Sequence, residues 1–253
     1  LMPVTIIYAL TIMDWRNIWI VISVAIILFL PLVSYFLVKE VKLSSREDDN
    51  EVIKENIKQW KRSEVIKDYR FIIIALNMLA MPWIATGIFV YQSFILSAKN
   101  WGEYTIAQSF MVYSIASVLT LFVAGYLIDK FTSRKLLIYM NIPFLISLLI
   151  LFYFQSPVSS FFFLGLIGVS NGFANVLGSS TWAELYGVKF IGSIKALTTA
   201  LMVFSTAFGT AFFGLMIDFN FSIEQISMIS GCYILISLIL LFLIKNKLNP
   251  TIL

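Results

Sequence analysis

Runs of roughly twenty apolar residues, separated by short polar turns, constrain this chain more than any other feature of its sequence. An α-helix of about 20 apolar residues crosses the hydrocarbon core of a bilayer. Only 13% of the residues are charged, against roughly a quarter in a soluble domain, and the mean hydropathy is +0.91. Such a chain cannot cover a water-facing surface, so we expect an all-α, polytopic membrane bundle. The predicted complete spans are residues 17–38, 71–96, 104–128, 136–154, 158–181, 191–217 and 224–244, with residues 1–13 as a truncated eighth.

The basic residues of the connecting loops alternate from one side of the predicted bundle to the other. Of the 18 lysines and arginines, Arg16 and Lys99 lie in the loops of one side, and the remaining sixteen lie on the opposite side. Because basic loops stay in the cytoplasm, one orientation satisfies every loop. We expect a multi-pass protein of the cell (inner) membrane with a cytoplasmic C-terminus, in which the chain enters in mid-span at Leu1. The loops of the poorly charged side are residues 14–16, 99–103, 155–157 and 218–221.

The long loop, residues 39–70, carries a helical pattern. Ser44 and Glu47 have the spacing of a capping box, in which two side chains satisfy each other's free backbone N–H groups. Apolar residues recur behind them at helical spacing, at Ile53, Ile57 and Trp60. The pattern predicts an amphipathic helix on the inner leaflet. A solvated linker with incidental periodicity is the alternative.

Composition also excludes several chemistries. The chain has no histidine, which is the commonest general base, proton shuttle and metal ligand. Its one cysteine, Cys232, has no metal-ligand spacing around it, and no paired carboxylates fall inside a predicted span. We therefore expect no enzyme activity, no cofactor and no bound metal. The net charge of +4 lies in loops beside apolar spans, which indicates membrane topology and not nucleic-acid binding.

A short pattern, Gly-x-x-x-Asp, occurs twice, three spans apart and in opposite orientations. It ends one span at residues 125–129 and another at residues 214–218. Transporter bundles are often built from three-helix units in inverted topology. The pattern therefore favours a 3+3 inverted repeat, although a pattern this short also arises by chance.

Three stretches of the chain resemble the major facilitator superfamily. Residues 125–135, Gly-Tyr-Leu-Ile-Asp-Lys-Phe-Thr-Ser-Arg-Lys, resemble the family's cytoplasmic signature, with Thr132 and Ser133 in place of its glycine-containing step. Residues 14–16 resemble the turn between helices 5 and 6, and residues 182–195 resemble the helix 10 to 11 connection of bacterial carboxylate porters.

The resemblance covers essentially the whole chain and implies a particular organisation. The chain would run from the end of helix 5 to helix 12 of a twelve-helix transporter. Residues 1–38 would be the end of an N-terminal bundle, residues 39–70 a cytoplasmic central loop, and residues 71–253 a C-terminal six-helix bundle.

The signature has a physical rationale as a conformational latch. Gly125 would let two helix backbones approach closely, and Asp129 would accept charge-assisted hydrogen bonds from a helix N-terminus or an arginine. Lys130, Arg134 and Lys135 would supply ion-pair partners. Simple anchoring at the basic side of the membrane is the alternative, and it leaves the glycine and the aspartate unexplained.

Uncharged polar residues are concentrated in the third, fifth and sixth complete spans, whereas the fourth and seventh are poor in them. In the resembled family, helices 7, 8, 10 and 11 line the cavity and helices 9 and 12 are peripheral, so we expect Leu148 and Ile239 to face lipid. Asn171-Gly172 indicates a close helix contact, and Pro82 a bend. The expected substrate-binding residues are Thr86, Gln92, Tyr113, Ser117, Asn171, Asn175 and Ser205. A single hydroxyl commonly bonds its own or a neighbouring helix, so the tyrosine and the two asparagines carry most of this hypothesis.

These features predict a secondary transporter that moves a small solute by alternating access. The resemblance to carboxylate porters implies a small organic anion such as a monocarboxylate, although no arginine lies in the cavity-lining spans. Efflux of apolar compounds and a non-transporting membrane sensor on the same fold remain alternatives. Apart from Glu184 and Lys195 near span ends, no ionisable residue falls well inside a span, so the upstream half is expected to handle any coupling ion. The expected partners are the solute and the bilayer. The full-length protein is expected to act as a monomer, and this chain alone is expected not to transport.

Overall fold

The computed structural model of the chain describes residues 2–38 and 58–251. It divides into two compact units, Leu1–Asn56 and Ile57–Leu253, and each unit is described by itself. The boundary between the units falls inside the predicted loop, residues 39–70. Residues 44–57, on which the capping box and most of the amphipathic helix are predicted, lie outside the described residues.

Unit 1 consists of two helices in its described part, α1 (Met2–Leu10) and α2 (Trp15–Val38). The turn between them ends at Asp14, whose backbone carbonyl accepts the N–H groups of Asn17 and Ile18 and so starts α2. The first part of α2, Trp15–Tyr35, is long and apolar enough to cross a membrane.

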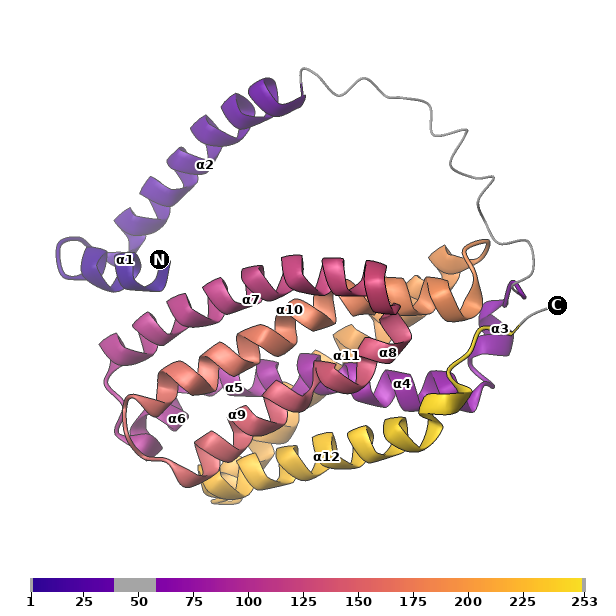
Figure 1. Cartoon of the computed structure of the whole chain (residues 1–253). Helices are drawn as coiled ribbons and strands as arrows, with labels where there is room; N and C mark the ends of the chain where they lie inside the picture. Colours follow the sequence, from indigo (N-terminus) through magenta and orange to yellow (C-terminus); the bar gives the residue numbers. More distant parts are fainter. Residues whose placement is uncertain (1, 39–57, 252–253) are drawn as a thin grey trace. The chain divides into compact units, whose positions relative to one another are not determined.

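Unit 2 is a bundle of helices that run past one another along most of their length (Figure 1). Its elements are α3 (Arg62–Val65), α4 (Tyr69–Ala80), the π-helix η2 (Met81–Ala85), α5 (Thr86–Val90), α6 (Gln92–Lys99), α7 (Glu103–Phe131), α8 (Ser133–Met140), α9 (Ile142–Tyr153), α10 (Ser159–Tyr186), α11 (Ile191–Asp218), α12 (Ile223–Ile244) and the 3₁₀ turn η3 (Lys245–Lys247). The described parts of the chain contain no β-strand, which confirms the predicted all-α class.

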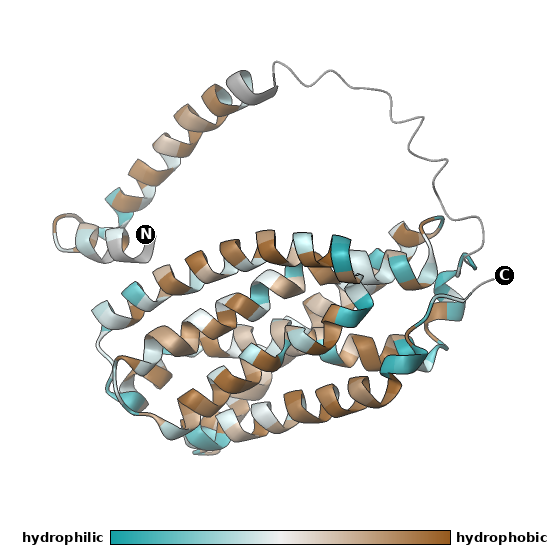
Figure 2. Ribbon diagram, viewed as in Figure 1, coloured by the Kyte–Doolittle hydropathy of each residue, from teal (hydrophilic) through white to brown (hydrophobic). Residues whose placement is uncertain are grey.

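Seven helical segments in the described residues are long and apolar enough to span a membrane. They coincide with the seven complete spans predicted from the sequence, within a few residues at most ends. Figure 2 shows hydrophobic residues along the helices of unit 2 and hydrophilic residues gathered towards their ends. This is the distribution expected of a multi-pass membrane protein.

Two of the predicted spans are not continuous α-helices. The span that begins at Tyr69 passes through the π-helical turn Met81–Ala85, with Pro82 at its start, because proline lacks the N–H that an α-helix needs. The span from Ser133 to Tyr153 is divided between α8 and α9 at Asn141, two residues before Pro143. Only the first of these irregularities, at Pro82, is indicated by the sequence analysis.

The fourth and seventh spans pack against each other through α9 and α12. Leu148 on α9 is 2% exposed, and its carbonyl accepts the hydroxyl of Ser227 on α12 at 2.7 Å. The prediction that Leu148 faces lipid is therefore wrong, because α12 covers that side of α9. Ile239 on α12 is 51% exposed, as expected of a residue on an outward face.

Candidate functional site

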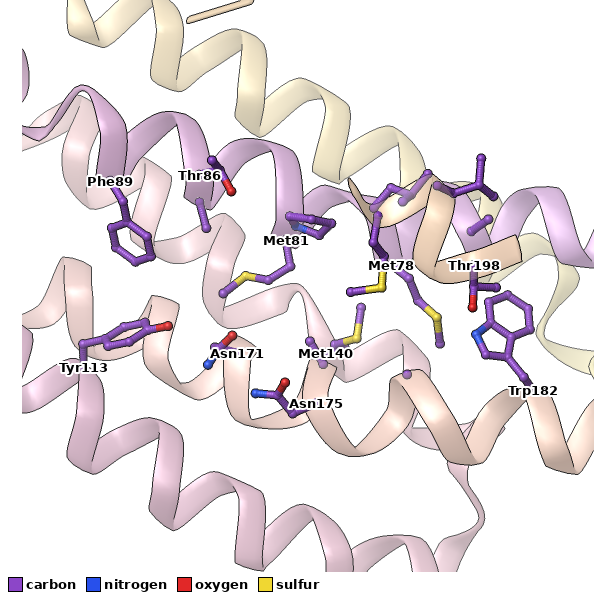
Figure 3. Close-up of a pocket in the computed structure, with 18 residues that line it drawn as sticks. Met78, Met81, Thr86, Phe89, Tyr113, Met140, Asn171, Asn175, Trp182 and Thr198 are labelled. Carbon is purple, nitrogen blue, oxygen red and sulfur yellow. The ribbon is translucent and has the colours of Figure 1, made fainter. Parts of the chain in front are cut away.

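A cavity of about 230 Å³ lies inside unit 2, among the segment α4–η2–α5 and helices α7, α8, α10 and α11. Figure 3 shows Tyr113, Asn171 and Asn175 on one side of it, and Phe89, Thr86 and Met81 on the other. α12 contributes no lining residue, whereas α8 contributes Met140. The other residues that line the cavity are Ala75, Met78, Leu79, Pro82, Ala85, Ala174, Gly178, Trp182, Thr198, Leu201 and Met202.

Two glycines of α10 set the polar side of the cavity. A β-carbon at Gly168 would collide with the backbone carbonyl of Tyr113, and one at Gly172 would lie 2.6 Å from the carbonyl oxygen of Ser117. Only glycine therefore lets the backbones of α7 and α10 approach this closely. The close contact predicted at Asn171-Gly172 is confirmed, and it brings the Asn171 amide to Ser117, where Nδ2 donates to Oγ at 2.9 Å.

The opposite wall is shaped by the π-helix. Gly209 of α11 packs directly on the carbonyl of Trp83, so η2 and α11 also touch backbone to backbone. The Trp83 ring lies among Phe208, Phe212 and Tyr233, with ring centroids 5.2–5.8 Å away, and does not line the cavity. The neighbouring residues Met81, Pro82 and Thr86 line it instead. A π-helix carries an extra residue in its turn, which changes which side chains of this span face inward.

The structure brings four of the seven predicted substrate-binding residues together and places three elsewhere. Thr86, Tyr113, Asn171 and Asn175 line the cavity. Ser117 does not line the cavity, and its hydroxyl accepts a hydrogen bond from the Asn171 amide. Gln92 lies beyond the break of its span at Tyr91, among apolar residues of α6, α7 and α10. Ser205 lies in a separate aromatic groove, where its hydroxyl donates to the carbonyl of Leu79.

The apolar residues that line the cavity are not among those predicted from the sequence. Met78, Met81, Met140 and Met202 come from four different elements and meet at this cavity together with Trp182. An apolar residue in an apolar span carries no signal that it faces a cavity. The sequence does mark Thr198 as polar in a polar-rich span, and it also lines the cavity.

None of the described residues that line the cavity is charged. The side chains with hydrogen-bonding groups are the two asparagine amides, the Tyr113 hydroxyl, the hydroxyls of Thr86 and Thr198 and the indole N–H of Trp182. Thioethers and aromatic rings make up much of the remaining surface. Such a lining can hold an uncharged molecule, or the uncharged part of a larger one, with a few directed hydrogen bonds.

Of the five predicted latch residues, Arg134 makes ionic contacts within unit 2. Its Nε lies 2.8 Å from Oε1 of Glu184, at the end of α10. The second oxygen of Glu184 accepts the backbone N–H of Ser133 at 2.9 Å and also its hydroxyl. Glu184 thus caps the N-terminus of α8 from a neighbouring helix. Glu184 stands out in the sequence as an ionisable residue near a span end, but its pairing with Arg134 is not among the predictions.

The other latch residues lie at open positions in unit 2. Asp129, Lys130 and Lys135 are exposed, and Asp129 makes no ion pair with any residue in the described ranges. A β-carbon at Gly125 would have no atom within 4 Å. Within this unit, therefore, Gly125 does not serve the close helix contact predicted for it.

The connection between α7 and α8 is a single residue, Thr132, with φ 73° and ψ 147°. This conformation is strained for a β-branched side chain and is readily adopted only by glycine. It occurs at the step where the resembled signature has a glycine. Thr132 supplies the turn nonetheless, so the fold of the signature is kept at a cost in strain.

The same end of unit 2 holds a second ionic cluster. Arg70 pairs with Asp68 at 2.8 Å, and the Tyr186 hydroxyl donates to the same carboxylate at 3.1 Å. Trp60, the last apolar residue of the predicted surface-helix pattern, is not helical. Its ring packs edge-on against Tyr186, with centroids 5.5 Å apart.

The chain beyond α12 closes over both clusters. Arg70 Nη1 donates to the carbonyl of Asn249 at 2.8 Å, and Arg134 Nη1 donates to Asn249 Oδ1 at 2.8 Å and to the carbonyl of Leu248 at 3.1 Å. The two arginines therefore tie the residues after α12 to the starts of α4 and α8.

Comparison with known proteins places this architecture. The family model described as Major Facilitator Superfamily matches residues 1–210 and 72–251 of the chain. No curated protein matches the chain. Among solved structures, the chain is similar to the in meso crystal structure of PepTSo, a POT family transporter, with a TM-score of 0.57 and 17% sequence identity. The match covers 73% of this chain and 38% of that transporter, so the chain spans well under half of its length.

Proposed function

The chain belongs to the Major Facilitator Superfamily, and from that membership we propose that it is part of a secondary transporter that moves a small solute by alternating access. The cavity of unit 2 carries the proposal. It lies among the segment α4–η2–α5 and helices α7, α8, α10 and α11, and it holds uncharged hydrogen-bonding groups that a lipid-facing helix would not need. In transporters of this architecture, one helical bundle moves against the other around such a site.

The lining favours an uncharged or largely apolar solute over a carboxylate. A carboxylate in a low-dielectric cavity needs a positive charge or several directed donors, and none of the described lining residues carries a positive charge. Asn171, Asn175 and Tyr113 would bind one or two polar groups of the solute. The methionines, Trp182 and Phe89 would enclose its apolar part. A monocarboxylate, which the resemblance to carboxylate porters implies, is the competing solute class.

The test measures solute binding and transport by the full-length protein as it is expressed in its native cell. Tryptophan fluorescence, to which Trp182 in the cavity contributes, reports binding of a small aromatic amide and of a short-chain monocarboxylate. Uptake into liposomes then tests whether the bound solute crosses the membrane. We expect saturable binding and movement of the amide. Preferential uptake of the monocarboxylate would replace the proposed solute class, and binding without movement of any solute would favour a membrane sensor.

A pair of variants on neighbouring helices checks that the cavity is the site. Asn171→Ala removes an amide that lines the cavity, and we expect it to weaken binding by about tenfold, the equivalent of one hydrogen bond of roughly 1.4 kcal/mol. Ser114→Ala is the matched control, because the exposed Ser114 hydroxyl donates to the carbonyl of Phe110 on its own helix and does not line the cavity. Equal losses in the two variants would remove the cavity from the proposal.

A further inference from the structure

A second hollow, of about 690 Å³, lies outside the solute cavity, where α7 ends, α8 begins and α12 gives way to η3. Two stretches far apart in the sequence form it: the residues around the α7–α8 turn, and those that follow α12. The three candidate membrane spans that border it, Glu103–Phe131, Ser133–Tyr153 and Ile223–Lys247, all begin or end here. In a bilayer the hollow would therefore lie at the depth of the lipid headgroups.

The charged groups around the hollow are predominantly positive. Arg134 lines it, but its guanidinium is already occupied by Glu184 and by the residues after α12. Lys135 and Lys245 also line it and are exposed, and neither makes an ion pair with a described residue. Lys245 Nζ lies only over the Phe242 ring, at 3.7 Å. Glu184 is neutralised by Arg134, so two lysine ammonium groups are available to a ligand.

The remaining walls are apolar and partly open. Leu127, Phe131, Ile138 and Tyr139 line the hollow, and Phe131 and Tyr139 are 44% and 58% exposed. A free inorganic anion would gain nothing from such walls. A molecule with an anionic head and an apolar chain would place the head between the lysines and the chain along these side chains.

We propose that this hollow is a binding site for an anionic phospholipid, with the phosphate held by Lys135 and Lys245 and the first part of an acyl chain held against Phe131 and Tyr139. Arg134 also lines the hollow. It joins α8 to α10 through Glu184 and to the residues after α12 through Leu248 and Asn249. A phospholipid bound above it bridges Lys135 of α8 to Lys245 of η3, and so stabilises the same junction from outside.

Native mass spectrometry of the purified full chain tests the proposal, with phosphatidylglycerol and phosphatidylcholine of the same acyl chains as probes. We expect phosphatidylglycerol to bind in preference to phosphatidylcholine. In a separate thermal unfolding measurement, we expect it to raise the unfolding temperature of the protein. In the double variant Lys135→Gln/Lys245→Gln, we expect phosphatidylglycerol affinity to fall by about tenfold or more, because each lysine near an anionic surface contributes about 1 kcal/mol. Lys195→Gln is the matched control, since Lys195 is exposed near the start of α11 and does not line the hollow.

Two further arms separate lipid from free anion. Inorganic phosphate at millimolar concentration should not displace phosphatidylglycerol, and a short-chain phosphatidylglycerol should bind more weakly than a long-chain one. Displacement by phosphate, or binding independent of chain length, would make the hollow a simple anion site and overturn the proposal. Equal binding of the two lipids, or an equal loss in the Lys195→Gln control, would also overturn it. Circular dichroism of each variant confirms that it is folded.

Discussion

Glu184 and Asp129 are carboxylates at the same end of unit 2, and their surroundings differ. Glu184 accepts two hydrogen bonds from Ser133 and forms an ion pair with Arg134, whereas Asp129 is exposed and without an ion pair among the described residues. We expect Glu184→Gln to lower the free energy of unfolding by about 1–2 kcal/mol, because it weakens charge-assisted bonds.

We expect Asp129→Asn to leave stability unchanged and, as the latch hypothesis requires, to slow transport. Thermal unfolding and uptake rates check both, and unchanged uptake in Asp129→Asn would reduce the signature to an anchor.

Thr132 offers a test of strain at a single residue. Glycine adopts its φ of 73° without the clash that a β-carbon makes, and the buried Thr132 hydroxyl has no hydrogen-bond partner in the described structure. We expect Thr132→Gly to raise the free energy of unfolding by on the order of 1 kcal/mol, after the loss from a more flexible unfolded chain. Thr132→Ala is the control, since it removes the hydroxyl but keeps the β-carbon. An equal gain in both variants would assign the effect to the hydroxyl and not to the backbone.

At the scale of elements, the contact between α7 and α10 decides whether the cavity forms. Gly168→Ala would push the Tyr113 carbonyl away, and we expect a lower unfolding temperature together with weaker solute binding. Gly125→Ala is the matched control on α7, at a position where an added β-carbon meets no atom within 4 Å. It should be neutral or slightly stabilising, because alanine favours helix by roughly 0.5–1 kcal/mol over glycine. Equal behaviour of the two variants would contradict the close packing of α10 against α7 at Gly168.

The sequence predicts the existence of the helices better than their shape. Length and hydropathy predict all seven complete spans, since both follow directly from the thickness of a bilayer. They do not predict the break at Asn141 or the burial of Leu148 under α12, because in lipid an apolar side chain is equally suitable for a helix contact and for the membrane.

The candidate site shows the same division. Asn171, Asn175 and Tyr113 stand out in the sequence because polar groups are costly in lipid. Ser205 and Gln92 are also polar residues in apolar spans, so the sequence does not distinguish them from these three, but they lie outside the cavity. Their placement depends on the break at Tyr91 and on the packing of η2 against α11, which no local pattern encodes.

For the whole molecule, the proposed orientation puts the ends that carry Lys135 and Ser156 on opposite sides of the membrane. We expect a membrane-impermeant thiol reagent added outside cells to label Ser156→Cys and not Lys135→Cys, in a background where the exposed Cys232 is replaced by serine. Ser133 and Lys99 are unsuitable positions, because both are buried. Labelling of both cysteines from outside would refute the proposed topology.

At the end of unit 2 opposite Arg134, a different ion pair joins the helices. Lys99 is fully buried at the end of α6, and its ammonium lies 2.8 Å from Oε1 of Glu224 at the start of α12. Lys99 is the buried member of this pair and Glu224 is partly exposed, so removing Glu224 would leave a buried ammonium without its partner. The two ends of the bundle are therefore fastened separately, by Lys99–Glu224 at one and by the arginine clusters at the other.

The methionine side chains of the cavity have a consequence for the breadth of recognition. A thioether side chain has three rotatable bonds and refills irregular space at little cost, so Met78, Met81, Met140 and Met202 can fit around molecules of different outline. Selectivity between solutes would then depend on where a solute carries its polar group relative to the two asparagines, and only weakly on the shape of the solute. Replacing Met81 and Met202 by the stiffer isoleucine should reduce the number of different solutes that bind, while the affinity for the best-fitting solute stays nearly unchanged. Such a cavity would change its preferences over evolution by moving one amide, with the surrounding bundle left intact.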